Sequence, residues 1–349
     1  MHRYVLWFDD RFAESKTKIK AISKALELDL LPIEKTEEDQ DWYSAFARHV
    51  EKREFDVKEV FLVVVDHFLA KSIKDASTFD KGASLCSALR IQFTDVPIIG
   101  VSKAQAEYIS ANQVNEYTYF EDFSSLPVDL EDDKSSRLLA IKSIMSGFWK
   151  MRSYKPRKKR SLALVSLAKV PKLSQNDFLR VIPLHLQLQE LSTKANEVFD
   201  WYMKTLFEYQ GVLIDRCSAA ARIGVTEEYF INCILPRIPD NCVYRGVFEN
   251  VKGIRFWRNE LFSALQQMVG TDIPMEMSHY GEMFTKDKKN WAKCMSCGKY
   301  YTELDAYAER NINDKNNKRV PAHRLCVETA QGPCPIFFEP KYILDKGLR

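Results

Sequence analysis

The stretch that decides the fold of this chain is Arg3-Tyr4-Val5-Leu6-Trp7-Phe8-Asp9-Asp10. Its apolar part is continuous and does not alternate with polar residues, which is typical of a strand buried on both faces of a parallel sheet. Two acids follow at once, so we expect Asp9 and Asp10 at the carboxyl end of that strand. Open α/β sheets bind their ligands along this edge. The stretch therefore predicts an α/β fold with a polar site at Asp9 and Asp10.

Two further apolar runs end in the same manner. Residues 60–66 read VFLVVVD and residues 97–102 read PIIGVS, so these strands end in Asp66 and Ser102. A shorter strand is predicted at residues 28–33, and Pro32 favours a position at the sheet edge. The other predicted elements are helices at 11–26, 41–53, 81–91, 104–111 and 134–151 and a strand at 114–120. Alternating strands and helices predict a doubly wound parallel sheet.

The order of these elements over residues 1–125 resembles the receiver domain of bacterial response regulators. The resemblance implies a bacterial source and a flavodoxin-like sheet with strand order 2-1-3-4-5. It matches Asp9 and Asp10 to the acid pair of the family, Asp66 to the phosphoaccepting aspartate and Ser102 to the hydroxyl residue. One position departs, because Phe120 aligns where the family carries Lys. The resemblance is therefore to a receiver-like domain, with a pseudo-receiver as one form of it.

The chemistry of these residues supports a divalent cation site. Carboxylates that converge at strand ends suit Mg²⁺, which prefers oxygen ligands, so Asp9, Asp10 and Asp66 are the candidate ligands. Such a cation would offset the charge of a phosphoryl group on Asp66, with Ser102 as a hydrogen-bond donor. Without the lysine, one cationic contact with that group is missing. The alternative is that the acids only end strands and cap helices.

Length and charge limit the class of protein. The 349 residues are enough for two or three domains. Residues 1–130 carry a net charge of −7 and the remainder +10, which predicts different partners for the two parts. We find no signal peptide and no apolar run of about 18 residues. We therefore expect a cytoplasmic protein with protein partners and no membrane contact.

Four parts are predicted along the chain: a receiver-like domain (1–130), a helix and basic linker (131–172), a mainly helical domain (173–285) and a small zinc-binding module (286–349). Residues Arg152–Lys172 contain eight basic residues and no acid. This composition favours an exposed linker. The alternative is that the linker binds the phosphates of nucleic acid.

Two patterns mark the helical domain. Val198, Trp201, Tyr202, Leu206 and Tyr209 follow a helical spacing, which indicates a packed core and not a ligand site. Residues 219–226, AAARIGVT, resemble the turn of a DNA-binding helix-turn-helix. The next residues are Glu227 and Glu228, which would repel phosphates. We therefore favour a structural helix pair.

The cysteines of the C-terminal region have the spacing of a zinc site. Cys294 and Cys297 form a CxxC knuckle followed by Gly298, and Cys326 and Cys334 lie downstream. Four thiolates would complete a closed, structural zinc site. His323 is the alternative ligand, in place of one of the later cysteines. The remaining cysteines are predicted to be core thiols: Cys86, Cys217, Cys233 and Cys242.

Several enzyme classes lack support in the sequence. A ββα-metal nuclease would need His and acidic residues between the cysteine pairs, but the single His between Cys297 and Cys326 is His323, beside a candidate zinc ligand. There is no GxxxxGK[ST] loop, no GxGxxG and no GxSxG.

Our leading hypothesis is thus a non-enzymatic regulatory or scaffold protein, with a multigene signalling or defence system as its setting. The second is a nucleic-acid-binding regulator that uses the basic linker, the helix pair and the zinc module. The third is a Mg²⁺-dependent phosphoryl-transfer or phosphoacceptor protein that uses Asp9, Asp10 and Asp66.

Overall fold

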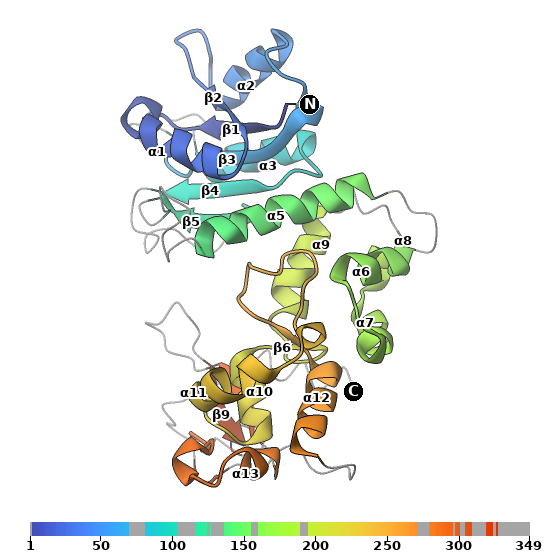
Figure 1. Cartoon of the computed structure of the whole chain (residues 1–349). Coiled ribbons are helices and arrows are strands. Elements are labelled where there is room, and N and C mark those ends of the chain that lie inside the picture. Colours follow the sequence, from blue (N-terminus) through green and yellow to red (C-terminus); the bar gives the residue numbers. More distant parts are fainter. Residues whose placement is uncertain are drawn as a thin grey trace. The chain divides into compact units, whose positions relative to one another are not determined.

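The computed structural model of the chain is drawn in Figure 1. It describes residues 2–69, 81–102, 116–123, 126, 136–154, 160–188, 195–270, 279–295, 297–300, 304–308, 319–323 and 326. The chain forms two compact units. The N-terminal unit contains Met1–Leu167, Ile182–Tyr202 and Gly246–Val251, and the C-terminal unit contains Ala168–Val181, Met203–Arg245 and Lys252–Arg349. The four-part division expected from the sequence stays a prediction.

A five-stranded parallel sheet forms the core of the N-terminal unit. Its strands are β1 (Tyr4–Phe8), β2 (Asp29–Ile33), β3 (Val60–Asp66), β4 (Ile98–Ser102) and β5 (Tyr119–Asp122). The strand order is β2-β1-β3-β4-β5, and all neighbouring strands are parallel. The predicted flavodoxin-like sheet with order 2-1-3-4-5 is therefore confirmed. As Pro32 predicted, β2 lies at one edge.

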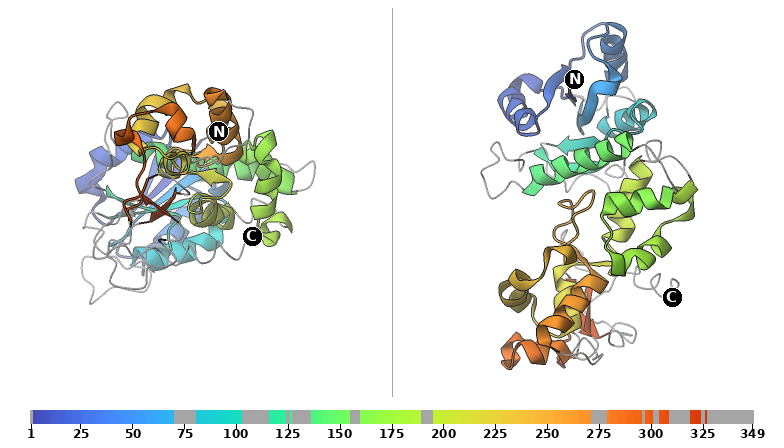
Figure 2. Two further views of the ribbon diagram at one scale, coloured as in Figure 1. Left: turned by 90° about the horizontal axis from the view of Figure 1, so that it is seen from below. Right: turned by 45° about the vertical axis from the view of Figure 1, so that its right-hand side comes forward.

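Helices cover both faces of this sheet. On one face, α1 (Phe12–Ala25) and α5 (Ser136–Ser153) pack against the sheet together with Val5 and Trp7 of β1. On the other, α2 (Trp42–Glu51) and α3 (Gly82–Gln92) pack together with alternate residues of β1. The two faces explain why the apolar run of β1 is unbroken. Figure 2 shows α5, in green, running along the sheet. The predicted helix 104–111 lies outside the described residues.

Three shorter helices belong wholly or mostly to this unit. They are α6 (Arg160–Ala168), α8 (Leu184–Leu188) and α9 (Ala195–Trp201). The ring of Phe248 lies 5.0 Å from Phe199, 5.3 Å from Tyr202 and 6.2 Å from Phe148 of α5. These T-shaped contacts join α5, α9 and the inserted segment 246–251. The predicted core stripe is confirmed for Val198, Trp201, Tyr202 and Leu206, which are buried.

The predicted exposed linker is wrong for part of its length. Residues Arg160–Ala168 form helix α6, in which Ala163, Leu164 and Ala168 are buried. The apolar residues of this segment form the buried face of α6. The high content of basic residues did not indicate that face. Arg152, at the end of α5, pairs with Asp95 at 3.2 Å. Residues 155–159 lie outside the described part of the chain.

The C-terminal unit combines short helices with two small antiparallel sheets. Its helices are α7 (Gln175–Val181), α10 (Arg216–Ile223), α11 (Glu227–Tyr229), α12 (Arg258–Val269) and α13 (Tyr280–Phe284). Its strand pairs are β6 (Leu213–Ile214) with β7 (Phe256–Trp257), and β8 (Leu304–Ala308) with β9 (Arg319–His323). Within the described residues, no helix has both the length and the apolar character needed to cross a membrane.

Helices α10 and α11 form the predicted pair. Gly224 ends α10 in the left-handed conformation, with φ of 82°, and the Thr226 hydroxyl accepts the Tyr229 N–H to begin α11. Glycine adopts this backbone conformation without strain. The core of this region includes Ala219, Ala220, Phe230 and Leu265.

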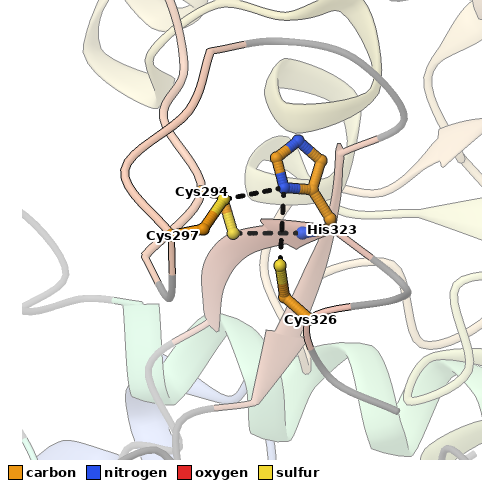
Figure 3. Close-up of side chains that lie close together, drawn as sticks. All are labelled: Cys294, Cys297, His323 and Cys326. Atoms are coloured by element: carbon orange, nitrogen blue, oxygen red, sulfur yellow. Dashed lines mark hydrogen bonds between the residues drawn. The ribbon is translucent and has the colours of Figure 1, made fainter. Parts of the chain in front are cut away.

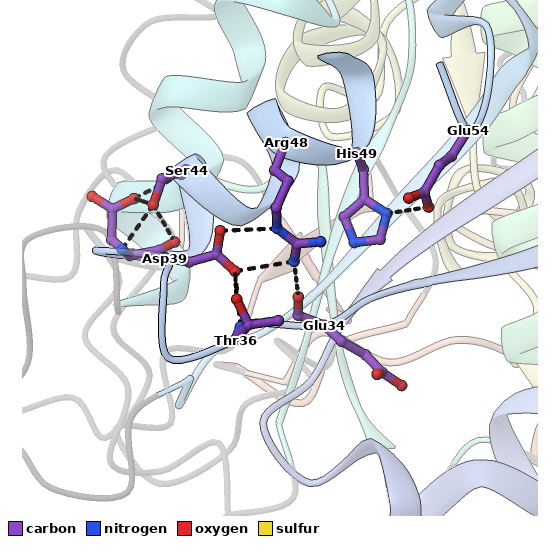
Figure 4. A network of polar contacts seen from close by, with 8 residues as sticks. Glu34, Thr36, Asp39, Ser44, Arg48, His49 and Glu54 are labelled. Carbon is purple, nitrogen blue, oxygen red and sulfur yellow. Dashed lines mark hydrogen bonds and ion pairs between the residues drawn. The ribbon is translucent and has the colours of Figure 1, made fainter. Parts of the chain in front are cut away.

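A polar network fixes the connection between β2 and α2 (Figure 4). The Arg48 guanidinium donates to both carboxylate oxygens of Asp39 at 3.0 Å and to the Glu34 carbonyl at 2.8 Å. Thr36 donates to the same carboxylate through its N–H and its hydroxyl. These contacts, with that of Arg48 first, hold the pKa of Asp39 well below its usual value. The network thus holds the loop that follows β2 in a hydrogen-bonded turn, in which the Asp39 carboxylate is ionised.

Gly82 has no room for a side chain at the start of α3. A Cβ there would lie 2.6 Å from the Tyr117 hydroxyl and 2.8 Å from the His67 Cα, and it would also meet the Asp66 carbonyl. The glycine therefore lets α3 begin against the backbone of residues 66–67.

We predict that Gly82→Ala lowers the free energy of unfolding by about 1–3 kcal/mol, because backbone must move to relieve the overlap. Gly211→Ala is the matched control, since a Cβ at Gly211 meets nothing within 4 Å. Thermal and urea unfolding of both variants measure the difference. Equal stability of the two variants would contradict the tight packing at Gly82.

Candidate functional site

Three carboxylates converge at the carboxyl edge of the parallel sheet. Asp9 and Asp10 follow β1, and Asp66 ends β3. Phe8 is level with Val65 in the register of these strands, so Asp9 comes level with Asp66. One oxygen from each of the three side chains lies within 4.8 Å of the others. Asp9 and Asp66 are 5% and 2% exposed, so the cluster is largely shielded from water.

Two of these acids also stabilise local turns. The Asp9 carboxylate accepts the Arg11 N–H at 2.8 Å, and the Asp66 carboxylate accepts the Phe68 N–H at 3.1 Å. Such side-chain turns are common where a strand passes into a loop. Capping and ligand binding are therefore not exclusive alternatives, because each carboxylate has a second oxygen and several lone pairs.

The cluster has the properties of a site for a hard divalent cation. Its donors are all carboxylate oxygens, which Mg²⁺ prefers, and three of them leave room for the waters that Mg²⁺ retains. Three carboxylates this close repel one another unless a cation or protons intervene. Arg11 offers partial compensation, with its Nε 3.8 Å from Asp10. The residues present thus fit Mg²⁺, with one oxygen from each acid.

Ser102 and β5 continue the same edge. Asp66 is level with Val101, and the buried Ser102 follows as the last residue of β4. Ser102 is level with Asp122, the last residue of β5. Phe120 is level with Gly100, two positions earlier, so the expected placement of Phe120 at the end of β5 is corrected. An acid, and not an aromatic residue, ends that strand.

Lys18, which no sequence pattern singled out, reaches the end of β5 from helix α1. Its Nζ donates to the Phe123 carbonyl at 2.6 Å and lies 4.7 Å from the centre of the Phe123 ring. Burial lowers the pKa of Lys18, and the charge of Asp122 opposes that shift. The helical spacing of apolar residues did not indicate a role for Lys18. Together with Lys16 and Lys20, this residue suggests only a solvated helix face.

A buried pair, His67 and Tyr117, lies next to Asp66. His67 Nδ1 is 3.1 Å from the Tyr117 hydroxyl, and its ring packs edge-on against Phe120. Burial lowers the pKa of His67 and raises that of Tyr117. Both groups are therefore held neutral, and they add no charge to the carboxylate cluster.

A second cluster gathers Cys294, Cys297, His323 and Cys326 in the C-terminal unit (Figure 3). The knuckle is a tight turn in which the Gly298 N–H donates to the Cys294 carbonyl at 2.9 Å. His323 is the last residue of β9, and its backbone N–H donates to the Cys294 sulfur at 3.4 Å. The ligand atoms of all four residues lie within 4.8 Å of one another.

The distances within this cluster fit a tetrahedral zinc site. His323 Nδ1 lies 3.3 Å from the Cys297 sulfur and 3.8 Å from the Cys326 sulfur. In a tetrahedral site with Zn–S bonds of about 2.3 Å and Zn–N bonds of about 2.0 Å, a sulfur and a nitrogen ligand lie about 3.5 Å apart. The structure therefore assembles the alternative set with His323. Cys334 lies outside the described residues.

Desolvation and the neighbouring Cys297 and Cys294 thiols raise the pKa of Cys326 to about 11. Crowded thiols hold their protons when no cation offsets the thiolate charge. Bound Zn²⁺ would supply that charge and favour the thiolates. The donor set is closed, since three sulfurs and one nitrogen complete four-coordination without water.

The cluster is anchored on helix α10. Small buried residues of the hairpin and helix pack together, among them Ala221, Ala306 and Ala322. The Arg222 guanidinium donates to both oxygens of Asp305 on β8, at 3.1 and 2.9 Å. Arg222 belongs to α10, so this ion pair fixes the β8–β9 hairpin to the α10–α11 helix pair.

Of the predicted core thiols, Cys86 and Cys242 are buried, and Cys217 is half-buried against the zinc-site hairpin. Cys233 is exposed, which corrects its expected burial.

Comparison with known proteins gives structural likenesses only. No family model matches the sequence, and no curated protein matches it. The receiver domain of NtrX from Brucella abortus is 15% identical over 41% of this chain and 96% of its own length, with a TM-score of 0.28. A response regulator from Thermotoga maritima is 14% identical over 40% of this chain and 99% of its own, with a TM-score of 0.27.

A CheY-like receiver domain from Methanospirillum hungatei JF-1 is 14% identical over 43% of this chain and 98% of its own, with a TM-score of 0.29. At these identities and TM-scores the likenesses carry no argument about this chain. The flavodoxin-like fold of the N-terminal unit follows from its own strand order and register.

We predict that zinc retention depends on His323 and not on Cys334. The wild-type chain should hold a single zinc ion, and His323→Ala should lose most of it because the tetrahedral set is broken. Elemental analysis of the purified chains measures zinc content. Cys233→Ser, which alters an exposed thiol, is the matched control.

Cys334→Ser should retain zinc. Loss of zinc in Cys334→Ser together with retention in His323→Ala would instead assign the four-cysteine set.

Proposed function

We propose that this chain is a non-enzymatic regulatory or scaffold protein whose receiver-like N-terminal domain binds Mg²⁺ and docks a protein partner. The observation that carries the proposal is the convergence of Asp9, Asp10 and Asp66 at the carboxyl edge of the sheet. That edge is where doubly wound sheets bind ligands. The cation would neutralise the cluster and hold the loops after β1 and β3 in one arrangement.

The charges along the edge favour docking over a stable phosphoryl switch. A phosphoryl group on Asp66 would bring further negative charge beside Asp9 and Asp10. The residue of β5 level with Ser102 is Asp122, an acid where a lysine would pair with the phosphoryl group. Lys18 of α1 interacts electrostatically with Asp122 and donates to the Phe123 carbonyl. We therefore expect little acyl phosphate from a small phosphodonor, and strong labelling that disappears in Asp66→Ala would establish a phosphoacceptor.

Zinc has a structural role in this proposal. The Cys294, Cys297, His323 and Cys326 set leaves no position for a reacting water, and the hairpin that carries it packs on α10. The ion would stabilise the C-terminal unit and the helix pair within it. A cytoplasmic location and a place in a multigene signalling or defence system belong to the same proposal.

We predict that Mg²⁺ raises the thermal stability of the wild-type chain. At ten times the dissociation constant the gain is about 1.4 kcal/mol, which moves the melting midpoint by a few degrees. Asp66→Asn should reduce the gain because one of the three negative charges that attract the cation is lost. Differential scanning fluorimetry at constant ionic strength measures the shift.

Asp29→Asn is the matched control. Asp29 begins β2, so it lies at the amino edge of the sheet, and its side chain is 62% exposed. Its variant should respond to Mg²⁺ as the wild type does. An Asp66→Asn variant that keeps the full Mg²⁺ response would contradict the proposed site.

A further inference from the structure

A strongly basic segment joins helix α13 to the zinc site. Residues 285–300 contain five lysines and a single acid, Asp287. All five lysines are exposed, and Trp291 and Tyr300 are half-buried. We call this set the lysine strip: Lys286, Lys288, Lys289, Lys293, Lys299, Trp291 and Tyr300. It lies outside the predicted basic linker, and the sequence analysis did not identify it.

The lysine strip is held on a fixed frame. The Thr226 N–H donates to the Asn290 carbonyl at 2.8 Å, and the Ala292 N–H donates to the Gly224 carbonyl at 2.9 Å. These bonds attach the segment to the turn between α10 and α11. At its other end, the Cys294 N–H donates to the Lys299 carbonyl at 2.8 Å. The segment is thus held at both ends, by the helix pair and by the zinc knuckle.

Cations and aromatic rings lie close together on this frame. Lys288 Nζ lies 5.8 Å from the centre of the Trp291 ring, and Lys293 Nζ lies 4.9 Å from the centre of the Tyr300 ring. The two rings are 5.9 Å apart and nearly perpendicular. Lysines are compact cations that bind phosphates, and exposed ring surfaces stack with bases.

We propose that the lysine strip binds single-stranded nucleic acid, with the lysines on the phosphates and the rings beside the bases. The spacing of charges and rings favours this ligand over an acidic peptide, which has no bases to stack. It also differs from a membrane-surface element, which would be an amphipathic helix. This proposal is independent of the Mg²⁺ site, because the strip lies in the C-terminal unit.

The helix pair favours a single strand over a duplex. A helix-turn-helix reads a duplex with the first residues of its second helix, and here these are Glu227 and Glu228. Glu227 lies 3.7 Å from Arg216, which offsets part of its charge. A duplex docked on α11 would still face these carboxylates, whereas a strand that follows residues 286–299 passes along the lysines.

The test uses the full-length, zinc-loaded chain and fluorescence anisotropy with four labelled probes: dT20, rU20, a 20-base-pair duplex and poly-glutamate. We expect binding of dT20 or rU20 that is tighter than binding of the duplex. In Lys288→Gln/Lys289→Gln/Lys293→Gln, affinity for the single strand should fall about tenfold at low salt. The slope of log affinity against log salt should lose about 2, from three phosphate contacts of about 0.7 each.

The control variant makes the same charge change elsewhere. Lys16, Lys20 and Lys24 are exposed on α1 of the N-terminal unit, and their replacement by Gln should leave affinity and salt slope unchanged. Zinc content and melting midpoint show that both variants fold.

Four results would overturn the proposal: no binding of either single strand, equal loss in both variants, tighter binding of the duplex, or equal binding of poly-glutamate. Whether dT20 or rU20 binds more tightly distinguishes DNA from RNA as the natural strand.

Discussion

The structure depends most on the register between β1 and β3. Both strands are buried on two faces, so each successive side chain must enter one core or the other. A slip of one residue would exchange the faces of an entire strand. The pairing of Phe8 with Val65 is therefore strongly fixed, and it brings Asp9 level with Asp66. Packing of apolar residues thus determines where the carboxylates meet, although the carboxylates themselves add nothing to that packing.

The sequence predicts this part well because burial on two faces produces a continuous apolar run. It predicts β5 less well. That strand has four residues, and all of them are only partly buried, so no apolar pattern fixes its register. Alignment therefore placed Phe120 at the strand end, where the structure has Asp122. The contact of Lys18 was not predicted for a related reason. A lysine on a solvated helix face gives no sign in the sequence that its side chain reaches the Phe123 carbonyl.

The cluster of cysteines and His323 shows a different limit. Spacing identified Cys294 and Cys297, because a knuckle is formed by neighbouring residues. The later ligands depend on the path of the chain between them, which spacing does not contain. Residues Arg319–His323 form a strand that returns to the knuckle, and this brings His323 to the site. The basic composition likewise predicted an exposed linker at α6, because it does not show that the apolar residues of this stretch lie on one buried face.

The uneven charge of the chain corresponds to two kinds of surface. The acidic N-terminal part gathers carboxylates at a sheet edge, where a cation would offset their charge. The basic C-terminal part presents lysines on a segment held by backbone hydrogen bonds, where an anion would offset their charge. In both parts the fold fixes the backbone that carries the charged residues, so binding would not have to order that backbone.

The proposed function depends on the three carboxylates forming one cation site. Crystals grown with Mn²⁺ in place of Mg²⁺ test it most directly, through anomalous diffraction at the manganese edge. We expect an anomalous peak between the carboxylates of Asp9, Asp10 and Asp66, about 2–2.5 Å from the ligating oxygens. A structure at saturating Mn²⁺ with no peak at this edge, or with these carboxylates turned apart, would contradict it.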